Sequence, residues 1–256
     1  MEDKTLLGQI DTQLEGGIAT ITFSHPAHNS LPGRLLAQLR DAIRQAGTNT
    51  ECRVIILKSG GNRTFCAGAS FDELMAISDF AAGKEFFLGF AQVINALREC
   101  PKFVIGSVQG KTIGGGVGLA AATDYCLATT FAAIKLSELA IGIGPFVVGP
   151  AVARKVGQSA FQQLAINATA FQTAEWAREK GLFAEVFPSI EELDAAVLKL
   201  AQQLAQSSPE AMKELKRISW EGTENWNELL DTRAAISGEL VLSDFTRNAI
   251  AAFKNK

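Results

Sequence analysis

Two glycine-rich segments each follow a short run of β-branched and apolar residues, and this pairing restricts the fold more than any other feature of the chain. The run RVIIL at 53–57 leads into KSGGNRTFCAGAS at 58–70, and FVIGSV at 103–108 leads into GKTIGGGVG at 110–118. Apolar runs of this length are typical of buried strands, and glycines let a backbone turn tightly or approach another group closely. Helical patterns follow both segments, so the order of strand, glycine-rich turn and helix is expected twice.

The rest of the chain continues this α/β pattern. Further β-branched runs predict strands, and apolar residues at helical spacing predict helices between them. From Ile190 onward the pattern is entirely helical, and no linker rich in Pro, Gly or Ser precedes it. We therefore place a core at residues 1–190 and a helical subdomain, packed on that core, at residues 191–256. Strands are expected at 18–23, 53–57, 103–108, 125–128, 133–136 and 183–187, and helices at 33–46 and 84–98.

Composition and charge exclude several classes of protein. Of the 256 residues 47% are hydrophobic, and 24 Lys and Arg stand against 27 Asp and Glu, which gives a net charge of −3. This profile excludes a disordered or fibrous chain and offers no basic excess for nucleic acid. No uninterrupted apolar stretch reaches the roughly 20 residues of a membrane helix. Four widely spaced cysteines, and an opening without an apolar signal segment, predict reduced thiols and a cytoplasmic location.

Nucleotide-binding motifs fail at single positions. The sequence GKT at 110–112 resembles the end of a P-loop, but Ile105 stands where that motif needs glycine. A dinucleotide fingerprint started at Gly114 ends on Leu119 instead of glycine. Neither an ATPase nor a nicotinamide-dependent enzyme is therefore expected.

Histidine chemistry is also not expected. His25 and His28 are the only histidines, and they lie in a polar loop around Pro26 without an acidic or cysteine partner nearby. A metal site normally needs more ligands than these two imidazoles. No G-x-S-x-G elbow surrounds any serine, so a Ser-His-Asp triad is not expected either.

Two glycine turns and one glutamate remain as candidates for chemistry. The turns at Ala67-Gly68 and Gly114–Gly116 would expose backbone N–H groups, and the second leads directly into a helix, whose N-terminus favours a developing oxyanion. Glu138 follows the expected strand 133–136 among small and apolar neighbours, where burial would raise its pKa and make it a general base. From the residues alone, close packing at the glycines and a solvated or helix-capping carboxylate at Glu138 remain open alternatives.

A set of motifs spread over nearly the whole chain occurs in a fixed order. These are Phe65–Phe71, Gly110, Gly114–Gly116, Asp124 and Ser137-Glu138, with Ile21–Leu31 near the start and Ser208-Pro209 and Asp244–Lys254 near the end. In order and spacing they resemble the crotonase superfamily, which includes enoyl-CoA hydratases and isomerases. The resemblance implies a crotonase-like spiral of repeated ββα units with a C-terminal helical trimerisation subdomain, assembled as a homotrimer or a dimer of trimers.

The resemblance also implies an acyl-CoA site. The backbone N–H groups of Ala67 and Gly115 would hold the thioester oxygen, and Glu138 would act as the general acid and base. Coenzyme A arrives as part of the substrate, so the family resemblance implies no separate cofactor and no metal. The residues expected to bind the substrate or its CoA are Ala67, Gly68, Ala69, Ser70, Gly114, Gly115 and Gly118.

Further positions are implied to lie near coenzyme A. Ser70 replaces an aspartate that is commoner in the family, and the contacts expected there come from the main chain. Arg63 and Lys111 are candidates for the CoA phosphates, with solvated surface charge as the alternative. Near the C-terminus, Phe253 and Lys254 resemble residues that approach CoA.

The resemblance departs from the best-known hydratases at one position. Gly118 stands where those enzymes carry the first of two catalytic glutamates, and its lack of a side chain would admit substrate bulk. Asp72 and Glu73 could supply a second acid if their helix turned them inward, although surface exposure is the alternative. The motifs around 114–119 and 136–146 most resemble the branch that contains methylglutaconyl-CoA hydratases. We expect an enoyl-CoA hydratase, with a Δ3-Δ2 enoyl-CoA isomerase or a non-catalytic acyl-CoA binder as alternatives.

Overall fold

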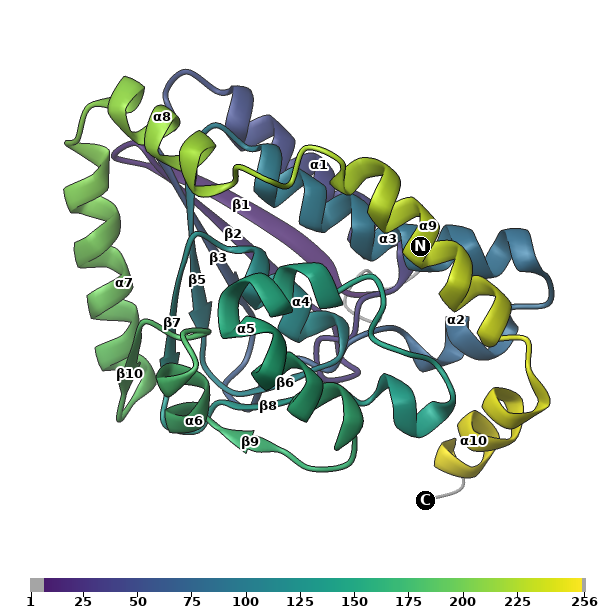
Figure 1. Cartoon of the computed structure of the whole chain (residues 1–256). Coiled ribbons are helices and arrows are strands. Elements are labelled where there is room, and N and C mark those ends of the chain that lie inside the picture. Colours follow the sequence, from purple (N-terminus) through teal and green to yellow (C-terminus); the bar gives the residue numbers. More distant parts are fainter. Residues whose placement is uncertain (1–6, 255–256) are drawn as a thin grey trace.

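The chain forms two β-sheets surrounded by helices, as Figure 1 shows for the computed structural model, which describes residues 7–254. The larger sheet has the order β1-β2-β3-β5-β7-β10, in which only the β1–β2 pair is antiparallel. The smaller sheet has the order β4-β6-β8-β9, and its first three strands are parallel. The strands are β1 Gln9–Glu15, β2 Ile18–Ser24, β3 Val54–Ser59, β4 Thr64–Cys66, β5 Phe103–Val108, β6 Lys111–Ile113, β7 Tyr125–Thr129, β8 Ala133–Lys135, β9 Gln172–Thr173 and β10 Glu185–Phe187.

Both faces of the larger sheet are buried, which explains its continuous apolar runs. In β3, Ile55 and Leu57 face the main core, while Val54 and Ile56 face a second cluster on the opposite side. Helix α7 covers that opposite side with apolar residues that include Leu193. The helices are α1 Gly33–Thr48, α2 Phe71–Ala76, α3 Phe80–Glu99, α4 Gly115–Ala122, the 3₁₀ helix η1 Glu138–Ile141, α5 Gly149–Ile166, α6 Ala174–Glu179, α7 Ile190–Ala205, α8 Pro209–Ser219, α9 Trp226–Leu240 and α10 Asp244–Lys254.

The chain repeats one unit three times. In each repeat a strand of the larger sheet (β3, β5 or β7) is followed by a short strand of the smaller sheet (β4, β6 or β8) and then by helical structure. This arrangement confirms the α/β fold class and the spiral of ββα units. The strands expected at 18–23, 53–57, 103–108, 125–128, 133–136 and 183–187 all exist, with ends shifted by two residues or fewer.

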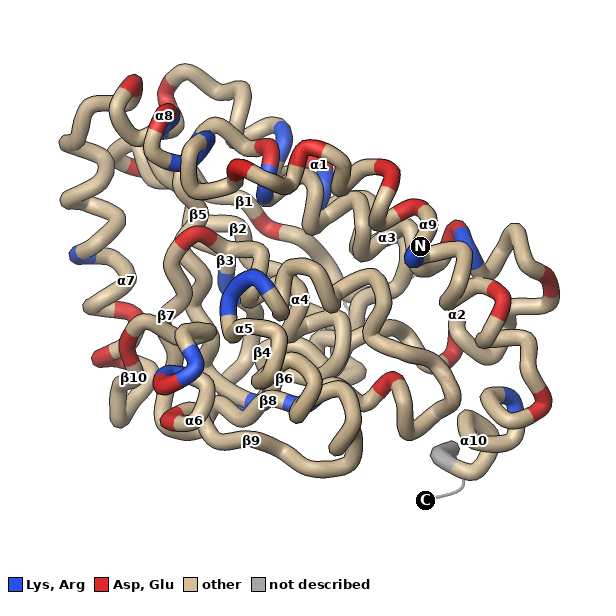
Figure 2. Tube along the Cα trace, in the orientation of Figure 1, with Lys and Arg blue, Asp and Glu red and all other residues tan. Residues whose placement is uncertain are grey.

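Helix α4 lies in the middle of the molecule and carries no charge. Its sequence is GGVGLAAA, and every residue from Gly116 to Ala122 is buried. In Figure 2 charged positions lie on the other helices, on loops and on some strands, while the trace of α4 has none. Among the described residues no helix is both long and apolar enough to cross a membrane.

The C-terminal helices pack on the core at separate places. α7 covers the larger sheet, α9 lies along α3, and α10 contacts α2 and η1. The contact between α3 and α9 is so close that a Cβ atom on Gly83 would lie 2.8 Å from the carbonyl oxygen of Gly238. Nothing in a single chain tests the expected boundary at residue 190 or the trimerisation role of these helices, so both stay predictions.

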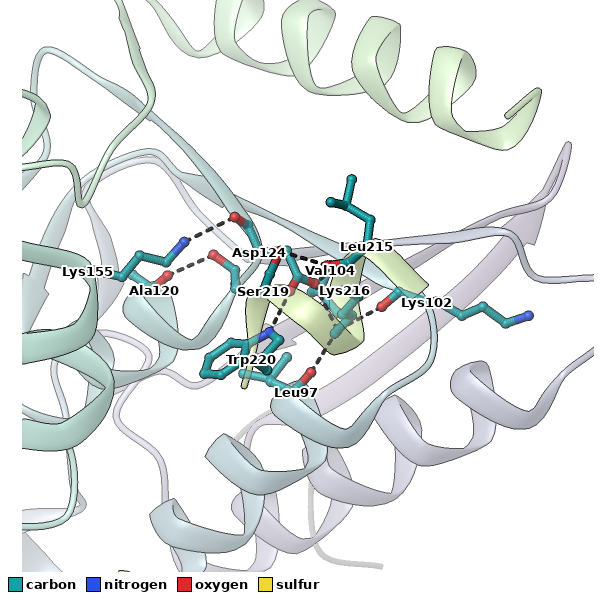
Figure 3. Close-up of polar contacts among 11 residues, drawn as sticks. Leu97, Lys102, Val104, Ala120, Asp124, Lys155, Leu215, Lys216, Ser219 and Trp220 are labelled. Carbon is teal, nitrogen blue, oxygen red and sulfur yellow. Dashed lines mark hydrogen bonds and ion pairs between the residues drawn. The ribbon is translucent and has the colours of Figure 1, made fainter. Parts of the chain in front are cut away.

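A buried ion pair fixes α8 to the core (Figure 3). The ammonium of Lys216 lies 2.8 Å from Asp124 Oδ2 and donates to the carbonyl oxygens of Leu97 and Lys102, each at 2.8 Å. The same carboxylate accepts hydrogen bonds from the Val104 N–H at 2.7 Å and from the Trp220 indole N–H at 2.9 Å. Every donor of the ammonium therefore has an acceptor, the condition under which a buried charge is tolerated.

Candidate active site

Three segments that the sequence singled out come together at one edge of the smaller sheet. β4, β6 and β8 are parallel neighbours, so their carboxyl ends lie side by side. Residues 67–69 follow β4, residues 114–115 follow β6, and Ser137-Glu138 follow β8. All three segments line one cavity of about 650 Å³, a volume that includes the space at its opening to solvent. The fold thus places the predicted turns and the predicted carboxylate around a common space.

The N–H groups of the turn after β4 differ in what they bind. The N–H of Ala67 donates to the carbonyl oxygen of His28 at 3.1 Å, and the N–H of Gly68 donates to Cys66 Sγ at 3.4 Å. Ala69 pairs with Leu31 in an isolated parallel bridge, in which the N–H of Ala69 is turned away from Leu31. The N–H of Ala69 has no acceptor among the described residues. The available donor of this turn is therefore the N–H of Ala69 and not that of Ala67, the donor expected from the sequence.

The second turn supplies an unpaired N–H at the start of α4. The N–H of Gly114 donates to the Lys135 carbonyl oxygen at 2.8 Å, while that of Gly115, the first residue of the helix, has no acceptor among the described residues. A Cβ atom on Gly115 would lie 2.1 Å from the Phe90 ring, so only glycine fits. A Cβ atom on Gly68 would lie 3.6 Å from the Gly115 nitrogen. The two turns thus lie beside each other, and each contributes one N–H without an acceptor among the described residues.

Glu138 is the first residue of η1 and lies against the second turn. A Cβ atom on Gly114, whose φ is +53°, would lie 3.1 Å from Glu138 Oε1, so the absence of a side chain there leaves room for the carboxyl group. Oε2 is buried and has no hydrogen-bond partner among the described residues. Burial raises the pKa of Glu138 to about 7, in the direction expected from its apolar neighbours.

The rest of the cavity wall is almost entirely apolar. Among the described lining residues, Glu138 is the single ionisable side chain. Ser237 of α9 also reaches the cavity, although it lies far from the other lining residues in the sequence. Sequence reasoning missed this serine, because only the packing of α9 on α3 brings it there. The apolar wall is formed by Phe71, Leu74, Phe87, Phe90, Ile141, Ile143, Val147 and Val148.

The free space expected beside Gly118 is absent. Gly118 is buried in α4 and does not line the cavity, and a Cβ atom on it would lie 2.5 Å from Val148 Cγ1. Val148 itself lines the cavity, so its side chain fills the space that was expected to admit substrate bulk.

The two acids proposed as substitutes for a second glutamate lie elsewhere. Asp72 is exposed on α2. Glu73 Oε2 accepts a hydrogen bond of 2.7 Å from the N–H of Gly33, at the start of α1. Glu73 therefore links α2 to α1, and neither acid lines the cavity.

Three other residues expected near coenzyme A do not line the cavity. Ser70 caps α2, where its hydroxyl accepts from the N–H of Glu73 at 3.4 Å, and it does not line the cavity. Arg63 and Lys111 are exposed beside the amino ends of β4 and β6, opposite the edge that carries the cavity. The expected CoA contacts of Phe253 and Lys254 concern side chains outside the described ones.

The imidazole of His25 is bonded to other residues of its own loop. Nδ1 of His25 accepts from the N–H of Ala27 at 3.2 Å and lies 3.2 Å from the Ser30 hydroxyl. Within residues 7–254 no group of three or more His, Cys, Asp or Glu could hold a metal ion. All four cysteines are free and buried, and burial raises the pKa of Cys66 to about 12.

Comparisons with known proteins show the family of this chain. Residues 13–256 match the enoyl-CoA hydratase/isomerase family. The peroxisomal Delta(3,5)-Delta(2,4)-dienoyl-CoA isomerase of Arabidopsis thaliana is 29% identical, over 98% of this chain and 95% of that protein. The human mitochondrial methylglutaconyl-CoA hydratase is 31% identical, over 77% of this chain and 58% of that protein. A solved enoyl-CoA hydratase from Mycobacterium avium superposes with a TM-score of 0.83 at 26% identity, over 96% of each chain.

Proposed function

Because the chain belongs to the enoyl-CoA hydratase/isomerase family, as its motifs predicted, we propose that it transforms an enoyl-CoA thioester through an enolate. The observation that carries this proposal is the position of a buried carboxyl group in one cavity with two backbone N–H donors that have no acceptor among the described residues. The donors hold the thioester oxygen, and Glu138 moves the proton.

The oxyanion hole consists of the N–H groups of Ala69 and Gly115. As an enolate forms, negative charge gathers on the thioester oxygen, and fixed donors stabilise it more than they stabilise the neutral carbonyl. Losing one such donor typically costs about 3–4 kcal/mol of transition-state stabilisation. We assign the first donor to Ala69, because the N–H of Ala67 is used by the His28 carbonyl oxygen.

Glu138 acts as base and then as acid. Its carboxylate takes a proton from the carbon next to the thioester carbonyl, and the electron pair of that C–H bond flows into the enolate. The protonated carboxyl then returns the proton to the carbon at the far end of the conjugated system. A pKa near 7 suits both steps, because the carboxyl changes its charge state near neutral pH.

Of the two reactions open to this site, the geometry favours double-bond isomerisation over hydration. A Δ3-to-Δ2 shift needs only a proton carrier over an enolate. Hydration also needs an ordered water, and a buried water typically requires two to four polar partners. Among the described lining residues, the polar side chains besides Glu138 are those of Ser137 and Ser237, and the space beside Gly118 is filled by Val148, so such a water would have few partners.

Hydration by Glu138 alone remains the second candidate, and it is the reaction that the sequence predicted. The human relative named methylglutaconyl-CoA hydratase supports it. In this mechanism Glu138 would take a proton from water as the hydroxyl adds to the double bond, and would then protonate the enolate.

Product analysis separates these reactions. The protein is incubated separately with 3-hexenoyl-CoA, crotonyl-CoA and 3-methylglutaconyl-CoA, the isomers are separated by chromatography, and the mass of each product is measured by mass spectrometry. We expect 3-hexenoyl-CoA to give a product of unchanged mass with a shifted double bond, and Glu138→Gln to abolish it. A product heavier by one water from either 2-enoyl substrate would identify a hydratase. Binding of all three without turnover would leave an acyl-CoA binder.

A further inference from the structure

The turn between β2 and α1 has an unusual backbone. His28 and Asn29 have φ values of +53° and +56°, and within residues 7–254 they are the non-glycine residues with positive φ. This left-handed conformation is disfavoured for residues that carry a Cβ, although asparagine tolerates it better than most. Asn29 is also buried, with 7% of its surface exposed. A strained and buried turn persists only where surrounding contacts hold it.

The side chain of Asn29 supplies those contacts. Its Nδ2 donates to the carbonyl oxygens of Gly60 at 2.7 Å and Thr64 at 2.8 Å, and its Oδ1 accepts from the N–H of His25 at 2.9 Å. Thr64 is the first residue of β4, the strand that leads to the first oxyanion turn. The amide therefore closes its own turn and fixes the beginning of β4.

The same turn also holds the other end of β4 through its backbone. The His28 carbonyl oxygen accepts from the N–H of Ala67, and the N–H of Leu31 donates to the Gly68 carbonyl oxygen at 2.8 Å. These bonds engage the two residues just before Ala69 and leave the N–H of Ala69 without an acceptor. The position of that donor thus depends on the turn that Asn29 closes.

We propose that Asn29 is a positioning residue for the oxyanion hole, acting through the turn at residues 25–31 on the N–H of Ala69. Asn29 does not line the cavity, so it acts without touching the substrate. The inference rests on the proposed function, because it requires the N–H of Ala69 to bind the thioester oxygen. Without the amide, the left-handed turn loses the contacts that hold it, and the His28 carbonyl oxygen shifts together with Ala67.

Substitutions can separate these contacts from the backbone conformation. Asn29→Gly keeps a residue that tolerates positive φ and removes all three side-chain bonds. Asn29→Asp keeps an acceptor for the N–H of His25 but sets a carboxylate oxygen against two carbonyl oxygens. Asn95→Ala is the matched control, because Asn95 is equally buried at 8% and its side chain bonds Arg98 on α3, away from β4.

The test reads the oxyanion hole directly. Each variant is made in a Glu138→Gln background to block turnover, and crotonyl-CoA labelled with ¹³C at its carbonyl is bound. The probe is the infrared carbonyl band. We expect the parent to lower the carbonyl frequency relative to free ligand, Asn95→Ala to keep this shift, and both Asn29 variants to lose most of it. When the Asn29 substitutions are made in the chain that keeps Glu138, kcat should fall roughly 10- to 100-fold relative to wild type, while KM changes less than about threefold.

The outcomes test the oxyanion hole and the positioning role of Asn29 separately. If the parent shows no shift with bound ligand, the oxyanion hole is wrong, and this inference falls with it. If the parent shows the shift and either folded Asn29 variant keeps both the shift and kcat, the oxyanion hole stands and the positioning role is overturned. Circular dichroism and thermal unfolding identify which variants are folded, and Asn29→Asp gives the readout if the glycine variant is not.

Discussion

Glu138 is placed so that one carboxyl group can both remove and return a proton. Its Oε2 has no hydrogen-bond partner among the described residues, and burial raises its pKa to about 7. A group with this pKa is partly ionised at neutral pH, so neither the base form nor the acid form is scarce there.

The pH dependence of activity should follow this carboxyl group. The first step needs the carboxylate, so kcat/KM should rise with pH and level off above an apparent pKa near 7, instead of near the ordinary glutamate pKa of 4.5. A pH profile of the turnover of 3-hexenoyl-CoA measures this directly. A profile that is flat between pH 5 and pH 8 would remove Glu138 from the role of base.

The same carboxyl group should make stability fall as pH rises. The unfolded chain releases this proton near pH 4.5, whereas the folded chain keeps it until about pH 7, so the folded state binds more protons between these values. The free energy of unfolding should therefore drop over this window by up to about 3 kcal/mol. Urea unfolding at pH 5 and pH 8 should show this loss in the wild type relative to Glu138→Gln. Equal pH dependence in both proteins would contradict the raised pKa.

The packing of Val148 on Gly118 gives a second test at this scale. Gly118→Ala should destabilise the fold by about 1–3 kcal/mol, because the new methyl group would lie 2.5 Å from Val148 Cγ1. Val148→Ala in the same chain should recover most of this loss, although it is destabilising alone. Urea unfolding of the double-mutant cycle measures the coupling. Additive effects would show that the two residues do not share this space.

Part of the site was predictable at the level of residues. Glu138 follows a strand that the sequence predicts, and Gly115 lies in the glycine turn that the sequence predicts to lead into a helix, so their places at the cavity could be inferred. The choice between Ala67 and Ala69 could not, because it depends on which N–H the distant His28 carbonyl oxygen engages. Val148 was missed for the same reason, since nothing in the sequence pairs it with Gly118.

At the scale of elements, the site depends on three strands of only three residues each. β4, β6 and β8 bring three distant segments to one edge, yet three residues are too few to display an alternating pattern. The sequence therefore predicts loops where β4 and β6 lie. It also missed β1, because that strand is largely exposed and carries no apolar alternation. The longer buried strands and the helices were found within a few residues.

The ion pair beneath α8 should be a large stabilising contact at this scale. Lys216→Met leaves the Asp124 carboxylate buried without its partner, which typically costs about 3–5 kcal/mol. Arg217→Met on the same helix is the control, because its side chain is 59% exposed and should matter by less than about 0.5 kcal/mol. Chemical unfolding compares the two variants. A small effect at Lys216 would mean that α8 is held mainly by its apolar contacts.

At the scale of the whole molecule, the C-terminal helices complete the site. α9 contributes Ser237 to the cavity, and α10 packs on η1, the helix that begins with Glu138. The helical subdomain predicted at residues 191–256 thus contributes to the wall of the cavity that holds Glu138. Its role in a homotrimer or a dimer of trimers stays a prediction, as does the cytoplasmic location.

The central claim is that Glu138 forms an enolate from a thioester bound by two backbone donors. The most direct measurement follows 3-hexenoyl-CoA in deuterium oxide and determines by mass spectrometry how much deuterium enters the recovered substrate and its isomer. Wild-type protein should introduce deuterium at carbons that gain or lose a proton through the enolate, and Glu138→Gln should introduce none. Bound substrate with neither isomerisation nor deuterium exchange in the wild type, or equal exchange in the variant, would contradict the claim.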